Sequence, residues 1–443
     1  MITVYSEQKS PRLSYILEVI CQGILGTGFK VMSDWKKFEK LDLPKINYSQ
    51  QYSKGTLSIV PQDLLFEKNI KNQKIKMKEW DELPCFFQTN KGGEVPFDLF
   101  AAAFYLITRY EEYLEDELDQ HGRYPVKSSL AYKEGFLDLP LVNLWVQKLK
   151  GLLVKKHPSY VFPEGEFHYI STIDVDMAFC YKHKGAWRNI GGIVRELLGM
   201  QFASAAKRMK VLSNQEPDPY DNFAWQIEQH QQQHIEVMYF MLLADHGKFD
   251  KNIDPDNEAF IEIIQNLAQY HRIGIHPSYN SNKQKKKLKT EVHRLENILL
   301  KEVETSRQHF LMFNIRETYQ RLYKQGIKED HSMGYSEMPG FRASICTPFR
   351  FFDLAKNETL DITLYPFAVM DVAFRHFLDW DIQKTEDYVV KLMRQVAEVQ
   401  GYFISVFHNE SLSDFDKWKG WRKVYLAMLD EANLLSNQAA SAS

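Results

Sequence analysis

Cysteine is scarce in this sequence, and no cysteine pair has the spacing of a metal or redox motif. The 443 residues contain four cysteines, Cys21, Cys85, Cys180 and Cys346, and none of them forms a CxxC pair. Scarce and widely separated cysteines exclude a disulfide framework, and we expect all four thiols to be reduced.

Long apolar runs are also missing. No stretch of 18 or more apolar residues occurs, so no membrane-spanning helix is expected. The first residues do not show the basic region, apolar run and small-residue cleavage site of a secretory signal. From these two features we expect a cytoplasmic protein.

Neither sign of charge predominates, since 55 Lys and Arg residues face 58 Asp and Glu residues. This balance excludes a global attraction to nucleic acid or to an anionic membrane. P-loop, GxGxxG, GxSxG and HExxH motifs are absent as well. Their absence argues against nucleotide hydrolysis, dinucleotide binding, a serine esterase and a zincin protease.

What the sequence does contain is enough apolar material for a large core, with 44% hydrophobic and 14% aromatic residues. A chain of this length suggests two or three domains. The clearest boundary is HPSYVFPEGE at 157–166, where two prolines and a glycine stand among polar residues. We therefore expect an α/β accessory domain over 1–160 and a second domain over 166–435. Helical spacing in the first predicts helices at 13–25, 97–114 and 141–154, and TLSIV at 56–60 predicts a strand.

The second region alternates between strand and helix patterns. The expected strands are 168–173, 235–243, 272–275, 309–313, 341–345, 360–369 and 402–407. The expected helices are 222–233, 257–270 with Asp256 as its cap, 285–300, 316–325, 386–399 and 421–435. This alternation predicts parallel βα units, and seven or eight strands suit a (β/α) barrel better than an open sheet. Catalytic residues of such barrels lie at the carboxyl ends of the strands.

Polar residues follow these strands where catalytic groups are expected. The first strand runs directly into Asp174 and Asp176, which can both reach one small site, one to bind a metal and one to act on water. His276 follows the strand RIGI, and His408 follows YFISVF. A neutral imidazole is a good metal ligand, and a histidine at the last strand is suited to act as a general acid. The simpler alternatives are turn or cap aspartates and hydrogen-bonded structural histidines.

Arg307 and His309 are two residues apart, so alternation in a strand would place both on one face. That pair would bring a cation and a metal ligand together, whereas the simpler alternative is a surface arginine and a partly buried histidine. Arg342 in GFRASI and Asp371 after YPFAVM are further polar groups in apolar surroundings. An arginine next to an aspartate would keep the carboxylate ionised or orient another group.

The order of these motifs resembles the polysaccharide deacetylase superfamily (NodB-homology, carbohydrate esterase 4-like), which has a distorted (β/α) barrel. TIDVD at 172–176, GIHPS at 274–278 and SVFHN at 405–409 resemble its first, second and last motifs. RQHFL at 307–311 and GFRAS at 340–344 are both candidates for its arginine motif, and the order of elements favours RQHFL. DLFAAAFYLITRYEEYL and HGRYP resemble a bacterial branch with an N-terminal accessory domain.

The resemblance implies a metal-dependent hydrolase that removes an N-acetyl group from an amino sugar or glycan precursor. Asp174 would be the base, Asp176 and His276 would bind a divalent metal such as zinc, and His408 would protonate the leaving amine. Residues with positioning roles would orient Asp174 or tune His408; these are Arg307, Arg342 and Asp371. Residues expected to contact the carbohydrate are Ser278, Tyr279, Asn280 and Asn409.

The sequence departs from the family pattern at two positions. Val175 separates the two aspartates, and Asn280 stands where a second histidine of the second motif is usual. His309 could supply the missing ligand, or Ser278 and Asn280 could contribute oxygen atoms. Two other hypotheses remain open: a hydrolase of a non-sugar amide or cyclic ureide, and a carbohydrate-binding protein without catalysis. None of the three involves nucleic acid.

Overall fold

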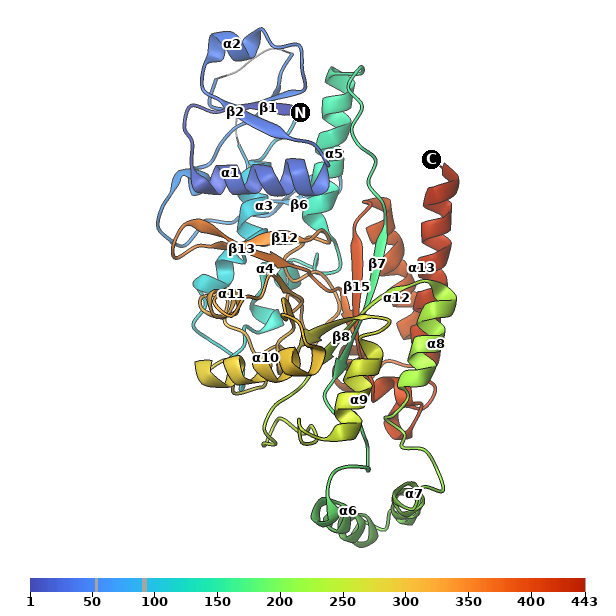
Figure 1. Ribbon diagram of the computed structural model, residues 1–443. Coiled ribbons are helices and arrows are strands. Elements are labelled where there is room, and N and C mark those ends of the chain that lie inside the picture. Colours follow the sequence, from blue (N-terminus) through green and yellow to red (C-terminus); the bar gives the residue numbers. More distant parts are fainter. Residues whose placement is uncertain (52–54, 90–93, 443) are drawn as a thin grey trace.

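The computed structural model describes residues 1–51, 55–89 and 94–442. The chain is a mixed α/β protein with a small N-terminal sheet and one large sheet (Figure 1). The small sheet is parallel in the order β2-β1-β3-β4, formed by β1 (Ile2–Tyr5), β2 (Phe29–Met32), β3 (Lys45–Tyr48) and β4 (Leu57–Ile59). A separate hairpin pairs β5 (Lys78–Trp80) with β6 (Leu83–Cys85).

The N-terminal helices follow the expected apolar spacing, with one early termination. They are α1 (Pro11–Leu17), continued by a π-helical segment Glu18–Ile24, α2 (Trp35–Glu39), α3 (Leu99–Ile107), α4 (Leu130–Lys133) and α5 (Leu141–Lys156). The helix expected at 97–114 ends at Ile107 because Arg109 takes a left-handed conformation with φ of 52°. Burial of Arg109 between Glu111 and Glu112 fixes this break.

The large sheet has nine strands among the described residues, in the order β12-β13-β11-β10-β9-β8-β7-β15-β14. The strands are β7 (His168–Val175), β8 (Glu236–Met241), β9 (Arg272–Ile275), β10 (Thr305–Ser306), β11 (Glu329–Asp330), β12 (Phe349–Asp353), β13 (Glu358–Leu364), β14 (Val369–Met370) and β15 (Tyr402–His408). All neighbours are parallel except β12 and β13. The central strands are almost completely buried, as expected for a parallel sheet with both faces covered.

Strand register collects the carboxyl ends of these strands at one edge. His408 of β15 is paired with Asp174 of β7, and Ile275 at the end of β9 is paired with both Met241 and Ser306. Side chains that follow β7, β9, β10 and β15 therefore meet in space.

Two expected strands are wrong. Residues 309–313 do not extend β10, because His309–Leu311 form a 3-10 turn in which Phe310 and Leu311 have positive φ. Residues 341–345 form turns, because their backbone bonds to the N-terminal region instead of a strand: Phe341 N–H donates to the Leu137 carbonyl at 2.7 Å. The strand expected at 360–369 is divided into β13 and β14.

The helices around the large sheet are α8 (Phe223–Gln233), α9 (Glu258–Leu267), α10 (Lys285–Leu299), α11 (Thr318–Tyr323), α12 (Ile382–Glu398) and α13 (Arg422–Ala442). The expected cap Asp256 is wrong, because the Asn257 side chain accepts the N–H of Phe260 at the start of α9. Two further helices, α6 (Ala186–Leu198) and α7 (Phe202–Leu212), stand away from the body at the bottom of Figure 1. No described helix combines the length and apolarity needed to cross a bilayer.

Candidate active site

Asp174 and Arg307 form a buried ion pair at the carboxyl edge of the sheet. Arg307 Nη1 donates to Asp174 Oδ1 at 2.9 Å, and its Nε donates to the His331 carbonyl at 2.9 Å. The guanidinium carbon lies 4.5 Å from the centre of the Phe240 ring and 5.6 Å from that of Phe367. Burial lowers the pKa of Arg307, while the charge of Asp174 opposes this shift. The pair fixes the orientation of the Asp174 carboxylate.

A second group, next to this pair, has the composition of a metal site. Asp176 follows β7, His276 follows β9, and His309 begins the turn after β10. His276 Nε2 lies 3.2 Å from Asp176 Oδ1, and His309 Nε2 lies 3.2 Å from Asp176 Oδ2. One ligand atom from each residue fits within 4.8 Å of the others. Asp174 Oδ2 is 3.7 Å from His276 Nε2, so both groups share one site.

The outer ring nitrogens of both histidines are held by acceptors. His276 Nδ1 is 2.6 Å from the Arg307 carbonyl oxygen, and His309 Nδ1 is 3.0 Å from Asp250 Oδ1. Each Nδ1 therefore donates, so Nε2 is the ring nitrogen directed at Asp176, and in a neutral ring this atom carries the lone pair that binds a metal. This second layer of acceptors around metal-binding histidines is a common feature of metal sites.

The residues fit a divalent cation because a carboxylate and two imidazole nitrogens converge here. Asp176 Oδ1 is buried and makes no hydrogen bond within the described part of the chain. A carboxylate and an imidazole lone pair at 3.2 Å repel unless a proton or a metal ion lies between them. Although burial lowers it, the charge of Asp176 raises the pKa of His309 to about 9, and the charge of His309 holds the pKa of Asp176 well below its usual range against burial. Two nitrogens and one carboxylate suit zinc or a similar ion.

His408, at the end of β15, and Asp371, directly after β14, form a hydrogen-bonded pair. His408 Nδ1 is 2.9 Å from Asp371 Oδ1, and the backbone N–H of His408 donates to Asp371 Oδ2 at 2.8 Å. His408 Nε2 lies 3.8 Å from Asp176 Oδ2. Burial lowers the pKa of His408, but the charges of Asp371, Asp176 and Asp174 raise it well above its usual value. These charges favour the protonated ring, which is the form that a general acid needs.

These groups open into a cavity of about 300 Å³. Its lining comes from the carboxyl edge of the sheet and from the N-terminal region: His121, Arg123, Asp174, Asp176, His276, Gln308, His309, Phe310, Leu311, Ser336, Met370, Val372, His376, Phe377, His408 and Glu410. Two of the lining side chains, Phe310 and Phe377, are exposed aromatic residues. This volume is enough for a small ligand group.

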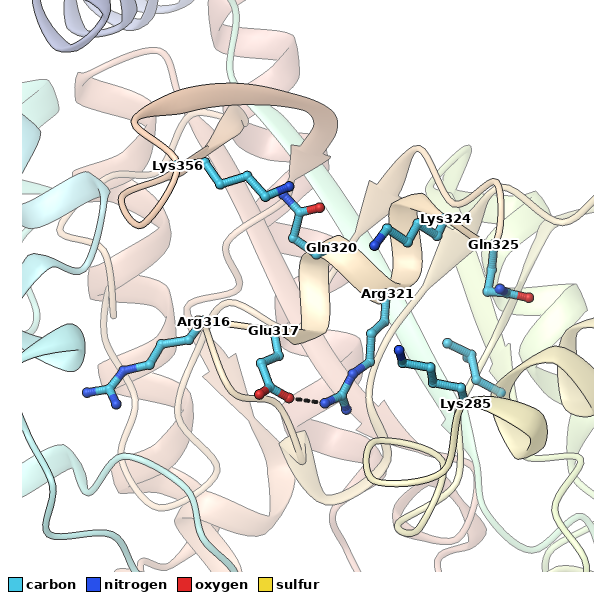
Figure 2. A pocket seen from close by; sticks show the side chains of 9 residues that line it. Lys285, Arg316, Glu317, Gln320, Arg321, Lys324, Gln325 and Lys356 are labelled. Carbon is cyan, nitrogen blue, oxygen red and sulfur yellow. Dashed lines mark hydrogen bonds and ion pairs between the residues drawn. The ribbon is translucent and has the colours of Figure 1, made fainter.

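A larger hollow of about 380 Å³ lies elsewhere, between α10 and α11. Figure 2 shows its polar lining, which includes Lys285, Arg316, Lys324 and the ion pair of Glu317 with Arg321. None of the residues predicted for catalysis or metal binding lines it. The candidate active site is therefore the cavity at the carboxyl edge of the sheet.

The structure brings together seven of the eight residues predicted for catalysis and metal binding. Those seven are Asp174, Asp176, His276, Arg307, His309, Asp371 and His408. Arg342 is bound elsewhere: its Nη2 donates to Glu112 Oε2 at 2.7 Å and its Nε to Oε1 at 2.9 Å. Its charge is therefore engaged by the N-terminal region and not by Asp174.

The predicted substrate-binding residues have other partners. Ser278 donates its hydroxyl to Glu291 at 2.5 Å, and the Asn409 amide donates to two backbone carbonyls, those of Met177 and Tyr220. Tyr279 Oη lies 3.0 Å from His121 Nδ1, and the Asn280 carbonyl accepts two N–H groups of the following turn. Ser278 and Asn409 thus have structural hydrogen bonds, while Tyr279 supports a residue of the cavity wall.

Asp250, His121, Arg123 and Glu410 were not predicted. Asp250 lies in ADHGKFD after the strand expected at 235–243, so the rule that polar residues follow strands would have found it. Glu410 lies two residues after His408, and burial raises its pKa. His121 and Arg123 lie in HGRYP, and no local pattern connects that motif with the distant strands.

Comparisons with known proteins give partial likenesses. A family described as "Family of unknown function (DUF7033)" matches residues 2–158. No curated protein matches the sequence. Among solved structures, a protein of Mycobacterium smegmatis assigned as a polysaccharide deacetylase is similar over 61% of this chain and 86% of its own, with 11% identity and a TM-score of 0.39.

Two other solved structures show the same kind of likeness. The polysaccharide deacetylase Bc1974 from Bacillus cereus has 11% identity and a TM-score of 0.28, over 60% of this chain and 88% of that chain. A BA3943 mutant, a CE4 family pseudoenzyme with restored enzymatic activity, has 10% identity and a TM-score of 0.27, over 62% and 64%. At these scores the likeness carries no weight for function, which rests on the site itself.

Proposed function

We propose that this protein is a metal-dependent hydrolase of the polysaccharide deacetylase superfamily, which removes an N-acetyl group from an amino sugar or glycan precursor. One observation carries the proposal: a group suited to bind a cation, Asp176, His276 and His309, lies in one cavity with an oriented carboxylate, Asp174, and with His408, whose Nδ1 is bonded to Asp371. Amide hydrolysis requires these three functions: polarisation of the carbonyl, activation of water and protonation of the amine.

The residues divide this chemistry between them. Asp174 accepts a proton from the attacking water, while Arg307 binds Oδ1 and leaves Oδ2 on the side of His276. A bound divalent ion supplies Lewis acidity and lowers the pKa of water toward 7. His408 holds its transferable proton at Nε2, because Nδ1 is bonded to Asp371, and gives it to the departing amine. The intact base and acid argue against a protein that only binds carbohydrate.

We further propose that the large sheet forms the distorted barrel of this superfamily. Two backbone hydrogen bonds support this proposal, because they connect the segment between β13 and β14 to strands toward opposite edges of the sheet. Tyr365 N–H donates to the Asp330 carbonyl of β11 at 2.9 Å, and Ala368 N–H donates to the Ile404 carbonyl of β15 at 2.9 Å. We also propose an accessory domain over 1–160 and a catalytic domain over 166–435, in agreement with the irregular segment 157–167 between α5 and β7.

The test is acetate release from N-acetylglucosamine oligomers by protein stripped of metal and then reloaded with zinc. We expect Asp174→Asn to lower kcat by about 10²- to 10⁴-fold with unchanged zinc content. Asp176→Ala should abolish both activity and zinc binding, whereas Asp245→Asn, an exposed aspartate paired with Arg294, should change neither. Full activity of stripped protein would refute metal dependence, and turnover of cyclic amides without acetate release would refute the acetyl substrate.

A further inference from the structure

The helices α6 and α7 form a hairpin inserted between β7 and α8, apart from the body of the molecule (Figure 1). The base of the hairpin is rigidly connected. Asp218 accepts hydrogen bonds from three successive backbone groups at 2.7–2.9 Å, those of Cys180, Tyr181 and Lys182. Hydrogen bonds therefore fix the base of the hairpin, although its helices project from the body of the molecule.

Its interior is polar. Arg208 of α7 donates Nη2 to Glu196 of α6 at 2.5 Å and Nη1 to Asn189 at 3.0 Å, and all three side chains are buried. Its guanidinium carbon lies 4.4 Å from the centre of the Tyr181 ring. Gly192 leaves room for it, since a Cβ there would lie 2.7 Å from Arg208 Cζ. An internal ion pair therefore connects the two helices where an ordinary hairpin has apolar contacts.

Its exterior carries many large apolar side chains, which is unusual for a water-exposed helix pair. Trp187 is 86% exposed, Leu198 81%, Met200 79% and Phe202 63%. Other exposed apolar side chains of the hairpin are Ile190, Val194, Leu197, Met209 and Leu212. So many large apolar side chains gathered on one projection indicate an interaction surface.

The charge of the hairpin indicates which kind of partner it can bind. Residues 182–212 contain seven Lys or Arg and one acidic residue, Glu196, although the whole chain has more acidic than basic residues. Exposed cations, among them Arg188, Arg195 and Lys210, accompany Trp, Phe and Leu side chains. Cationic amphipathic helices with exposed aromatic residues bind at anionic membrane interfaces. Two copies of so basic a hairpin would repel each other if paired face to face.

We propose that the α6–α7 hairpin docks the protein on the surface of an anionic phospholipid bilayer, with the apolar side chains inserted among the lipids. The segments that lead into and out of the hairpin are bonded to a residue beside the cavity. Asn409, next to His408, donates to the carbonyl of Met177, which follows Asp176, at 2.9 Å and to that of Tyr220 at 3.1 Å. If the proposed function holds, on which this consequence rests, the substrate class is an N-acetylated amino sugar carried on a membrane lipid.

The experiment is co-sedimentation of the full-length protein with vesicles of phosphatidylcholine, with and without phosphatidylglycerol. Wild type should bind the anionic vesicles, and added salt should weaken the binding. We expect two triple variants to lower the bound fraction at least about 10-fold: Trp187→Ser with Leu198→Ser and Phe202→Ser, and Arg188→Gln with Arg195→Gln and Lys210→Gln. Val161→Ser, at an exposed apolar residue outside the hairpin, is the matched control and should bind as wild type.

Asp174→Asn separates this proposal from the catalytic one, because it should bind vesicles as wild type does even where acetate release fails. All altered hairpin side chains are exposed, so circular dichroism and Tm should stay unchanged. A wild type that does not bind anionic vesicles overturns the proposal. So does a dimer in light scattering that becomes a monomer in the apolar variant, because the hairpin would then be covered by a second copy.

Discussion

Replacing Asp250 tests whether His309 is a metal ligand without touching any ligand. Asp250 Oδ1 lies 3.0 Å from His309 Nδ1 and accepts the N–H of Tyr279 at 2.9 Å. It thereby fixes both the tautomer and the orientation of the His309 ring. In Asp250→Ala the ring loses this partner, and its Nε2 is no longer held toward Asp176.

The expected magnitude follows from the role of such outer partners, whose loss usually weakens metal affinity 10- to 100-fold, or about 1.4–2.7 kcal/mol. Asp250→Asn keeps an oxygen at the Oδ1 position and removes only the charge, so its loss should be smaller. Asp245→Asn in the same loop is the control, since Asp245 is exposed and bound to Arg294.

The assay is a zinc titration of stripped protein against a chromophoric chelator, repeated as a zinc-dependent shift in Tm. Since zinc that binds only the folded state stabilises it in proportion to its affinity, both readouts should fall in the same order. Wild-type zinc affinity in Asp250→Ala would refute the assignment of His309 as a ligand that Asp250 orients. An equal loss in Asp245→Asn would show that the loop, and not this hydrogen bond, determines affinity.

Two further predictions concern stability. Glu112→Gln should lower the free energy of unfolding by about 3 kcal/mol in urea denaturation, because it removes the buried carboxylate bound to Arg342. The control Glu317→Gln, at an exposed ion pair, should lower it by less than about 0.5 kcal/mol. Equal losses in the two variants would contradict this reasoning. Burial, reinforced by the charge of His271, lowers the pKa of His230 from 6.5 to about 3. As the pH falls below about 6.5, His230 therefore binds a proton in the unfolded state but not in the folded state, and the free energy of unfolding decreases. From about pH 7.5 to 4.5 this residue should account for roughly 2.7 kcal/mol of lost stability, absent in His230→Gln; identical pH dependence of both proteins would argue against it.

The predictable part of the site is the part that depends on strand ends. Apolar runs leading directly into Asp174, His276 and His408 are visible in the sequence, and parallel register then brings the three side chains together. His309 reaches the site by a different route from the one expected. The strand predicted at 309–313 is a 3-10 turn. The position of the His309 ring is therefore set by the backbone turn at Phe310 and not by the alternation of side chains along a strand.

The unpredictable part depends on contacts between distant segments. Arg342 looked like a site residue because it interrupts an apolar stretch, yet its partner Glu112 lies 230 residues earlier in the chain. No local period reveals such a pair. The α6–α7 hairpin was not predicted either, because it buries Asn189, Glu196 and Arg208 and exposes many large apolar side chains, contrary to the pattern from which globular helices are inferred.

The N-terminal region takes part in building the site. Phe310 and Leu311 are consecutive non-glycine residues with φ of 58° and 50°, a conformation that costs about 1–2 kcal/mol for each residue. Arg123 binds this turn from outside: its Nη1 donates to the Phe310 carbonyl at 2.8 Å and to Ser336 Oγ at 3.1 Å, while Asp119 fixes its Nε. These hydrogen bonds offset the strain of the turn that begins with His309. The position of a metal ligand on the large sheet therefore depends on an arginine far away in the sequence, and the two regions form one site.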